Sequence, residues 1–485
     1  MTNTKSAPKR TRFYLHCLIG LLLMFGTWLL PPFDPITPVG MRVLGIFLGL
    51  IYMWTFVGSL WPSLLGIVAM ALSGYMTMNE ALAGSFGHNS ALIVLFTLVL
   101  FGAIEDVGVA QYVARWFLTR RIINGRPLVF SIMFLLGTYM LCSLIGPVAG
   151  LLFMWPIIYS ILVEVGYKSG DQYATIMVIG TFIAAVLGQG TIPFKSSPLV
   201  ILSTYQTVAG AAIPYFQYIL FAMITSIITL IGYVFLTKLF MRPDLSLIQA
   251  ISTDDFAKSP LPPMTRTQKI YFAVLWLYML SLLIPNMLPA AWPIIALLNK
   301  IGVIGITLLY IVALCLIQDQ GEPIFQFKRL AGKYLTWDIY FLVSSALVVS
   351  SALTAPQTGI KDFIVLMLDP LFGGRSVLTF SIILIIFSVL ITNVAANAVM
   401  GIVLMPVVYI FATNLGANPA ALAVIVTMSL HVAMLTPAAS PVAAILHGNT
   451  EWVRAQDIYK YCGLVVCATI LIYIVIGIPL ANLLF

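Results

Sequence analysis

The chain has few charged residues and no long polar stretch. Only 8% of its 485 residues are Asp, Glu, Lys or Arg, whereas 61% are hydrophobic and the mean hydropathy is +1.06. Soluble globular domains carry about 25% charged residues. The composition therefore excludes a soluble globular domain and indicates a polytopic membrane protein. The longest polar segment, 241–269, is too short to be a soluble catalytic domain.

Cysteines and catalytic signatures are also scarce. The five cysteines lie far apart and show no metal-ligand spacing. The sequence has no His-Glu-x-x-His motif, no paired intramembrane Asp and no Gly-rich phosphate loop after a strand. We therefore expect no enzyme activity and no cofactor, and the sequence assigns no metal site. The net charge of +8 bears on membrane topology, and we expect no nucleic-acid partner.

The positions of the positive charges predict the orientation in the membrane. With the N-terminus inside, nearly all of the 24 Lys and Arg residues fall in inside segments. The exceptions are Lys195, within the membrane, and four outside residues, Arg42, Lys300, Lys361 and Arg375. Because cytoplasmic loops carry an excess of Lys and Arg, we predict a multi-pass plasma-membrane protein with a cytoplasmic N-terminus and an outside C-terminus.

The apolar runs follow one order twice: span, interfacial helix, hairpin, broken span, span. Residues 1–240 form the first repeat, 241–269 a cytoplasmic linker and 270–485 the second repeat. The predicted special elements are interfacial helices at 109–123 and 359–371, re-entrant hairpins at 128–161 and 376–411, and broken helices at 174–204 and 420–447. An odd number of crossings per half makes the repeats inverted, as in secondary transporters. The predicted fold is all-α with about 11 transmembrane helices.

The stretch 187–198, Leu-Gly-Gln-Gly-Thr-Ile-Pro-Phe-Lys-Ser-Ser-Pro, carries the strongest functional signal. Its prolines and glycines break the helix, and broken backbone at membrane depth lines a cavity or is buried in protein. A cation such as Lys195 near the bilayer centre costs at least ~2.5 kcal/mol, which a bound anion would offset. The alternative is that Lys195 reaches the interface, or pairs with Glu164 or Asp171, for structure only.

Motifs occur at matching places in the two halves. Residues 392–398 are Thr-Asn-Val-Ala-Ala-Asn-Ala, and Pro406 follows Asn397. In the broken helices, 440–443 are Ser-Pro-Val-Ala and 196–199 are Ser-Ser-Pro-Leu. Over nearly its whole length the chain resembles the divalent anion/sodium symporter family of carboxylate and sulfate carriers. That family has Ser-Asn-Thr at each hairpin tip and Thr-Pro-Pro-Asn in the broken helices. Here Asn397 matches, Ala396 and Ala398 replace Ser and Thr, and the first tip has Gly146-Pro147-Val148.

The resemblance implies that the hairpin tips and broken helices bind sodium and substrate carboxylates. It also implies a homodimer in which a transport half, made of the hairpins and broken helices, moves like an elevator against a scaffold. Sodium needs several oxygen ligands, and the first tip offers no side-chain oxygen. We therefore predict a sodium-independent carrier in which Lys195 is the fixed counter-charge.

The predicted substrate is a small divalent anion, a di- or tricarboxylate such as succinate, malate or citrate, carried by secondary active transport. The alternatives are a sodium-coupled symporter of sulfate or dicarboxylate and an inorganic-anion/proton exchanger. The candidate substrate-binding residues are Lys195, Gln189, Thr191, Ser196, Ser197, Asn393, Asn397, Thr436 and Ser440. The candidates for a coupling ion, Na⁺ or H⁺, are Ser143, Gly190, Thr392 and His431. For Glu105 and Asp106 we expect Arg115 or Arg120 as partners.

Overall fold

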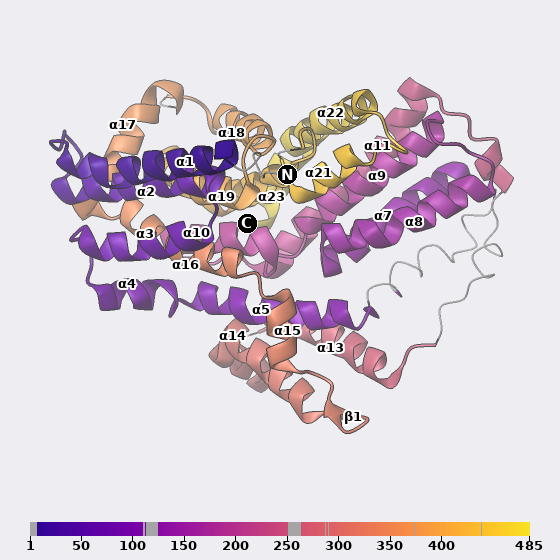
Figure 1. Cartoon of the computed structure of the whole chain (residues 1–485), viewed down its shortest axis with the longest axis horizontal. Coiled ribbons are helices and arrows are strands. Elements are labelled where there is room, and N and C mark those ends of the chain that lie inside the picture. The colour runs from indigo at the N-terminus through magenta and orange to yellow at the C-terminus, as the bar shows by residue number, and fades with distance from the viewer. Residues whose placement is uncertain are drawn as a thin grey trace.

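The structure is a computed structural model that is almost entirely helical (Figure 1). It describes residues 7–109, 112, 125–250, 263–286, 288–289, 291–372, 374–437 and 439–485. Within these ranges the strands are β1 (Gln318–Asp319) and β2 (Glu322–Pro323), which pair antiparallel. Most of the interfacial helix predicted at 109–123 lies outside the described residues, as does the middle of the predicted linker.

The first half of the chain consists of long apolar helices joined by short turns. Its helices are α1 (Ala7–Gly26), α2 (Pro38–Phe56), α3 (Leu60–Leu72), α4 (Met78–Ser85), α5 (Asn89–Asp106), α7 (Pro127–Ile145), α8 (Pro147–Glu164), α9 (Gln172–Gln189), α10 (Ser196–Ala209) and α11 (Tyr215–Met241). Many begin at a proline or a hydroxyl cap; the Thr37 side chain, for example, accepts a hydrogen bond from the backbone N–H of Gly40 at the start of α2.

The second half also consists largely of apolar helices. Its helices are α13 (Arg266–Leu283), α14 (Pro293–Leu316), α15 (Phe327–Tyr334), α16 (Trp337–Leu353), α17 (Ile360–Phe372), α18 (Val377–Ile391), α19 (Asn397–Asn414), α20 (Pro419–Leu430), α21 (Pro441–Gly448), α22 (Ala455–Ile472) and α23 (Ile478–Leu484). The short helices α4 and α15 are not predicted by the sequence, because they are too short to give an apolar run of their own.

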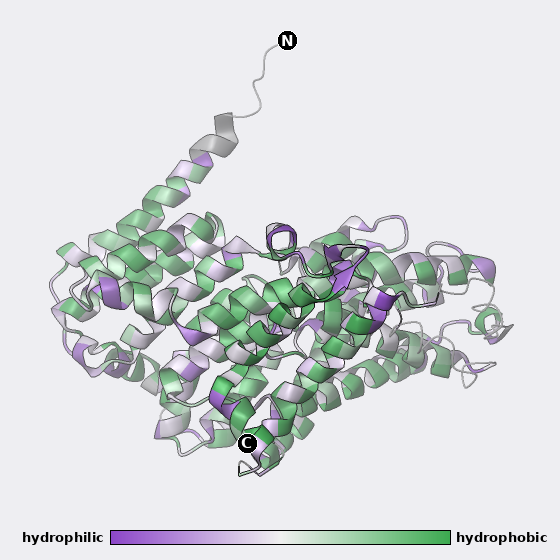
Figure 2. Cartoon of the chain, turned by 90° about the horizontal axis from the view of Figure 1, so that it is seen from below, coloured by the Kyte–Doolittle hydropathy of each residue, from purple (hydrophilic) through white to green (hydrophobic). Residues whose placement is uncertain are grey.

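The described helices can cross a membrane many times. Ten are long and apolar enough, and the count is 11 if α15 and α16, which meet at 79°, form one broken span. This confirms an all-α polytopic membrane protein with about 11 spans. Hydrophobic residues cover the helices, while hydrophilic ones gather at helix ends and in loops (Figure 2).

The predicted hairpins and breaks fall on identifiable turns. α7 and α8 meet at Gly146, whose φ of 97° and ψ of 159° suit glycine, and Pro147 then starts α8. α18 and α19 are joined by residues 392–396. Residues 190–195 separate α9 from α10, and 431–440 separate α20 from α21. The re-entrant nature of the hairpins and the inverted relation of the two halves remain predictions.

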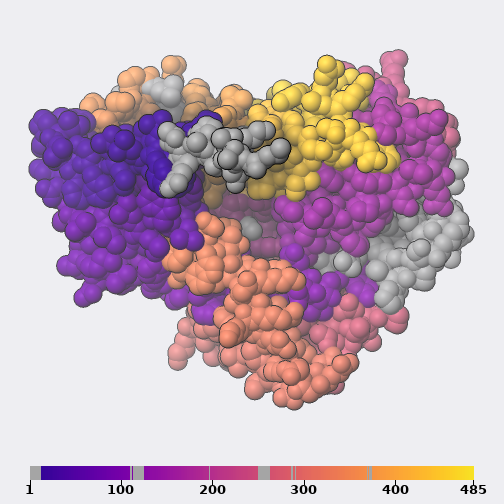
Figure 3. Space-filling model, in the orientation of Figure 1, coloured from indigo at the N-terminus to yellow at the C-terminus, as the bar shows by residue number. Residues whose placement is uncertain are grey.

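Three buried cores divide the molecule. The hairpin core joins α7–α9 and α11 with α18–α23. The α2–α16 core joins α2, α3 and α16 with parts of α10 and α19. The α5–α14 core joins the second half of α5 with α13 and α14 and includes Ile192 and Phe194 of the first break. In Figure 3 the magenta surface, from the first hairpin to α11, adjoins the yellow surface of the C-terminal helices, and α14 and α15 form the coral surface below them. The first break thus lies where cores meet.

Candidate site at the two helix breaks

The first break, residues 190–195, is held by tyrosines from neighbouring helices. Tyr218 Oη of α11 donates to the carbonyl of Gly190 at 2.7 Å. Thr191 Oγ1 donates to Tyr139 Oη of α7 at 2.8 Å. Both tyrosines are fully buried. Backbone carbonyls freed by a helix break must find donors inside the membrane, and Tyr218 supplies one of them.

Lys195 ends the break and points toward the first hairpin tip. Its Nζ donates to the carbonyl of Leu144, two residues before Gly146. The same Nζ lies 5.2 Å from the ring centroid of Phe101 on α5 and interacts electrostatically with Glu105. Neither Glu164 nor Asp171 is among its described contacts. One carbonyl and one aromatic face satisfy only part of an ammonium group, which has three protons to donate, so Lys195 can still bind another acceptor.

The first tip and the first break are packed tightly together. A Cβ added at Gly188 would lie 2.6 Å from the carbonyl oxygen of Tyr139 and 3.1 Å from the backbone nitrogen of Ser143. The Ser143 hydroxyl donates to the carbonyl of Met140 within its own helix, at 2.8 Å. Ser143 therefore lies at the contact between tip and break, but its proton is used locally.

The second tip is tied to the second break by the side chain of Asn393. Its Oδ1 accepts from the backbone N–H groups of Met434 and Leu435, at 3.0 and 2.8 Å. Its Nδ2 donates to the carbonyls of Val389 and Val432, at 2.6 and 3.3 Å. Three of these contacts satisfy backbone groups of the second break, and the fourth satisfies a carbonyl in the last turn of α18, all of which would otherwise be left unpaired.

Other polar residues of the second site are engaged with one another or with the backbone. Thr392 Oγ1 lies within hydrogen-bond distance of Asn397 Oδ1, at 2.9 Å, and of the Leu430 carbonyl. The Thr436 hydroxyl donates to the carbonyl of Asn393. Ser440 caps α21 by accepting from the backbone N–H of Ala443 at 3.1 Å. The predicted residues of the second half therefore come together at one place.

His431 joins the two breaks. Its Nδ1 lies 2.7 Å from the carbonyl of Thr427, and its Nε2 lies 2.8 Å from the hydroxyl of Ser197 at the start of α10. Because a carbonyl only accepts, Nδ1 carries the proton, and in the neutral ring Nε2 accepts from Ser197. Gly190 is close as well, since an added Cβ would lie 3.1 Å from His431 Cγ.

Most candidates thus fall into two tip-and-break pairs joined through His431. Gln189 is partly buried and makes no hydrogen bond with a described residue. The side chain of Ser196 lies outside the described part. Residues that the sequence did not single out are Tyr139, Tyr218 and Phe101, together with the carbonyl of Leu144. Tyrosines and phenylalanines within apolar runs give no signal of a polar or cationic partner, and a backbone carbonyl gives none at any position.

Asp106, the last residue of α5, is held by three side chains of α15. Asp106 accepts from Arg329 Nη2, Lys333 Nζ and Tyr334 Oη at 2.8, 2.6 and 2.9 Å, which fixes α15 to the end of α5. The expected partners, Arg115 and Arg120, lie outside the described residues.

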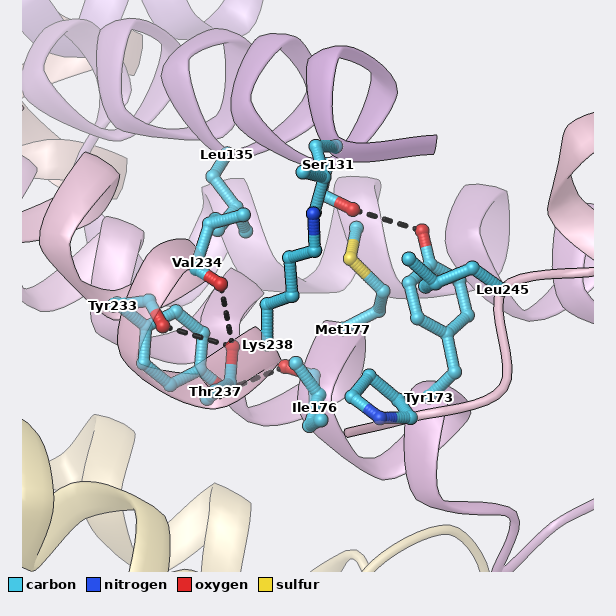
Figure 4. Close-up of a pocket in the computed structure, with 12 residues that line it drawn as sticks. Ser131, Leu135, Tyr173, Ile176, Met177, Tyr233, Val234, Thr237, Lys238 and Leu245 are labelled. Atoms are coloured by element: carbon cyan, nitrogen blue, oxygen red, sulfur yellow. Dashed lines mark hydrogen bonds between the residues drawn. The ribbon is translucent and has the colours of Figure 1, made fainter. Parts of the chain in front are cut away.

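Two cavities bear on where a substrate fits. The cavity between α7, α9 and α11 has a volume of about 10 Å³ and is lined by Ser131, Tyr173 and Tyr233 among others (Figure 4). That volume holds about one water molecule, so it is a packing defect and no carboxylate site. A larger cavity of about 510 Å³ is lined by Asn89, Tyr215 and Lys300. It approaches the first break, because Tyr215 packs edge-on against Phe194 with ring centroids 5.4 Å apart.

Comparison with known proteins decides the family. The family described as "CitMHS: Citrate transporter" matches residues 47–307, more than half of the chain. The chain belongs to this citrate transporter family. It is therefore a multi-pass membrane transporter and not an enzyme.

Two individual proteins are similar along most of the chain. The sodium-dependent dicarboxylate transporter SdcS of Staphylococcus saprophyticus is 23% identical over 458 residues, which are 89% of this chain and 84% of that protein. The crystal structure of the Alcanivorax borkumensis YdaH transporter matches with a TM-score of 0.56 at 13% identity, covering 97% of this chain and 96% of that one. The structural match to YdaH supports the polytopic transporter fold.

Proposed function

We propose that the chain carries small di- and tricarboxylates, such as succinate, malate and citrate, across the plasma membrane by secondary active transport. The family supports a carboxylate substrate, and the name of the relative from S. saprophyticus supports a dicarboxylate. The observation that carries the proposal is the placement of the Lys195 ammonium between the first break and the first hairpin tip.

Lys195 acts as the fixed counter-charge for the substrate. A carboxylate placed at Nζ would neutralise the ammonium and gain a charge-assisted hydrogen bond. Ser197 lies two residues further along, at the N-terminus of α10, where free backbone N–H groups also favour an anion. Thr191 of the same break and Gln189, the last residue of α9, are the proposed orienting groups on this side.

The transport is proposed to be independent of sodium. The first tip has Gly146, Pro147 and Val148, which supply no side-chain oxygen. At the second tip the side-chain oxygens of Asn393 and Asn397 already accept hydrogen bonds. A sodium ion would have to displace those contacts to gain ligands. The name of the relative from S. saprophyticus favours the alternative, a sodium-coupled symporter. In that case we propose that the sodium site lies at the second tip, around Thr392.

Protons are the other coupling ion that the site supports. A second proton on His431 would make Nε2 a donor, so the Ser197 hydroxyl would have to turn and accept. Protonation would therefore change the link between the two breaks. His431 is the proposed proton carrier if substrate uptake follows a pH gradient.

The larger-scale parts of the proposal follow the family resemblance. The hairpin core would move as the transport half against a scaffold, as an elevator, and the chain would work as a homodimer. The N-terminus would lie in the cytoplasm and the C-terminus outside.

The proposal is tested by uptake of labelled succinate and citrate into proteoliposomes, with and without sodium and pH gradients. We expect uptake that does not respond to sodium and that Lys195→Met abolishes. Lys361→Met is the matched control, because Lys361 is exposed on α17, and it should leave uptake unchanged. Uptake by Lys195→Met at the normal rate would overturn the role of Lys195, and uptake that requires sodium would favour the symporter.

A further inference from the structure

Glu105 is an acidic side chain beside Lys195 that the proposed function does not yet use. It lies in the last turn of α5, four residues after Phe101, so the two share one face of the helix. The ring of Phe101 is 5.2 Å from Lys195 Nζ, and the charges of Glu105 and Lys195 interact. A carboxylate therefore lies near the cation to which we assign the substrate.

The Glu105 carboxylate is free to respond to changes at Lys195. Its neighbour Asp106 is held by Arg329, Lys333 and Tyr334. In contrast, the side chain of Glu105 makes no hydrogen bond or ion pair with any residue in the described ranges. A partly buried carboxylate without such contacts depends on long-range attraction to a cation for its stability as an anion.

Glu105 and Lys195 lie where the hairpin core and the α5–α14 core meet. Glu105 ends the helix that packs with α13 and α14 in the α5–α14 core. The break that carries Lys195 joins the same core through Ile192 and Phe194, while α9 before the break lies in the hairpin core. Lys195 itself contacts Leu144 beside the first tip. The charge interaction of Glu105 with Lys195 thus acts at the place where the hairpin core meets the α5–α14 core.

We propose that Glu105 is the internal counter-ion that neutralises Lys195 when the substrate leaves. The inference rests on the proposed role of Lys195. In the loaded carrier the substrate carboxylate and Glu105 share one ammonium and repel each other, which weakens substrate binding and speeds release. In the empty carrier Glu105 neutralises Lys195, so that a bare cation is not left at the break.

The test compares citrate and succinate binding to the purified carrier in nanodiscs, by calorimetry, with uptake kinetics in proteoliposomes. Glu105→Gln should lower Kd about tenfold, which corresponds to ~1.4 kcal/mol. It should lower KM and also kcat, because release becomes slower. Glu105→Asp keeps the charge and should restore values close to those of the wild type.

Asp106→Asn is the matched control. It removes the same charge one residue along the chain, and should leave Kd unchanged because that carboxylate is committed to α15. In a Lys195→Met background, Glu105→Gln should no longer tighten binding. Should Glu105→Gln aggregate during purification, Glu105→Ala removes the same charge and takes its place in every comparison.

The outcomes separate the two proposals. If Lys195→Met binds citrate and succinate as tightly as the wild type, the proposed function of Lys195 fails. If Lys195→Met weakens binding while Glu105→Gln leaves Kd, KM and kcat at their wild-type values, the counter-ion role of Glu105 is wrong and that of Lys195 stands. Tighter binding by both Glu105→Gln and Asp106→Asn would show a general charge effect and would also overturn the assignment to Glu105.

Discussion

At the scale of single residues, a polar side chain bonds each break to its hairpin tip, and the two side chains reach in opposite directions. Lys195 belongs to the first break and donates to a carbonyl near the first tip. Asn393 belongs to the second tip and bonds backbone groups of the second break. The carboxamide is neutral and satisfied, so it serves structure. The ammonium keeps a charge that the backbone does not neutralise, so it can serve binding.

The stabilising role of Asn393 gives the first prediction. Asn393→Ala leaves the N–H groups of Met434 and Leu435 without their acceptor, and each unsatisfied buried group costs ~1–3 kcal/mol. We expect a melting temperature several degrees lower in detergent, measured by fluorescence. Asn393→Asp should be worse, since an oxygen would face the carbonyls of Val389 and Val432.

The control is Asn414→Ala, an exposed position at the end of α19, which should melt like the wild type. Melting of Asn393→Ala at the wild-type temperature would mean that the second break holds its shape without the carboxamide.

At the scale of elements, the site depends on how closely the first hairpin approaches the first broken helix. Gly188 of α9 faces the backbone of α7 at Tyr139 and Ser143 with no room for a methyl group. This contact sets the distance between the Leu144 carbonyl and the segment that carries Lys195. Packing between two helices thereby positions the cation.

Gly188→Ala tests this contact. The new Cβ would lie 2.6 Å from the Tyr139 carbonyl oxygen, a backbone atom that cannot turn away. Overpacking of this kind costs ~1–3 kcal/mol, so we expect a lower melting temperature together with weaker citrate binding. Gly232→Ala in α11 is the matched control, because nothing lies within 4 Å of its added Cβ, and it should be neutral or stabilising. Equal melting and binding for the two variants would contradict the close contact.

At the scale of the whole molecule, α11 is long enough to place the groups at its two ends on opposite sides of the membrane. It has 27 residues and is therefore ~40 Å long. Its first residue, Tyr215, lines the cavity that also contains Lys300, and Lys238 lies in its last turn. The predicted orientation places Lys300 outside and Lys238 inside.

Cysteine labelling in intact cells tests that orientation. In a chain whose native cysteines are replaced, Lys300→Cys should react with an impermeant maleimide added outside. Lys238→Cys should react only after the membrane is permeabilised, because cytoplasmic ends carry the basic residues. Both side chains are exposed, so access to the reagent is not limited by burial. The reverse pattern would invert the predicted topology, and labelling of both from outside would mean that α11 does not cross the membrane.

The sequence predicts where helices break and predicts much less about what the breaks touch. Glycine and proline act on their own backbone, so residues such as Pro193 and Pro441 mark interruptions without any knowledge of neighbours. The partner of Lys195 is a backbone carbonyl, which leaves no trace in the residue type of Leu144. The link between Ser197 and His431 joins residues far apart in the chain, and only the packing of α10 against α20 brings them together. The charge interaction of Glu105 with Lys195 also joins residues far apart in the chain, and it depends on the packing of α5 against α10.

Phe194 has a consequence for how fast the carrier works. Its ring is fully buried against Phe101, Tyr215 and Tyr278, within the α5–α14 core, while its backbone belongs to the first break. In the proposed elevator movement this ring must leave its aromatic neighbours before the break can travel. Withdrawing a buried phenylalanine costs ~2–3 kcal/mol. Each turnover therefore crosses an activation barrier to which one aromatic ring contributes, and trimming that ring to leucine would raise the rate of uptake.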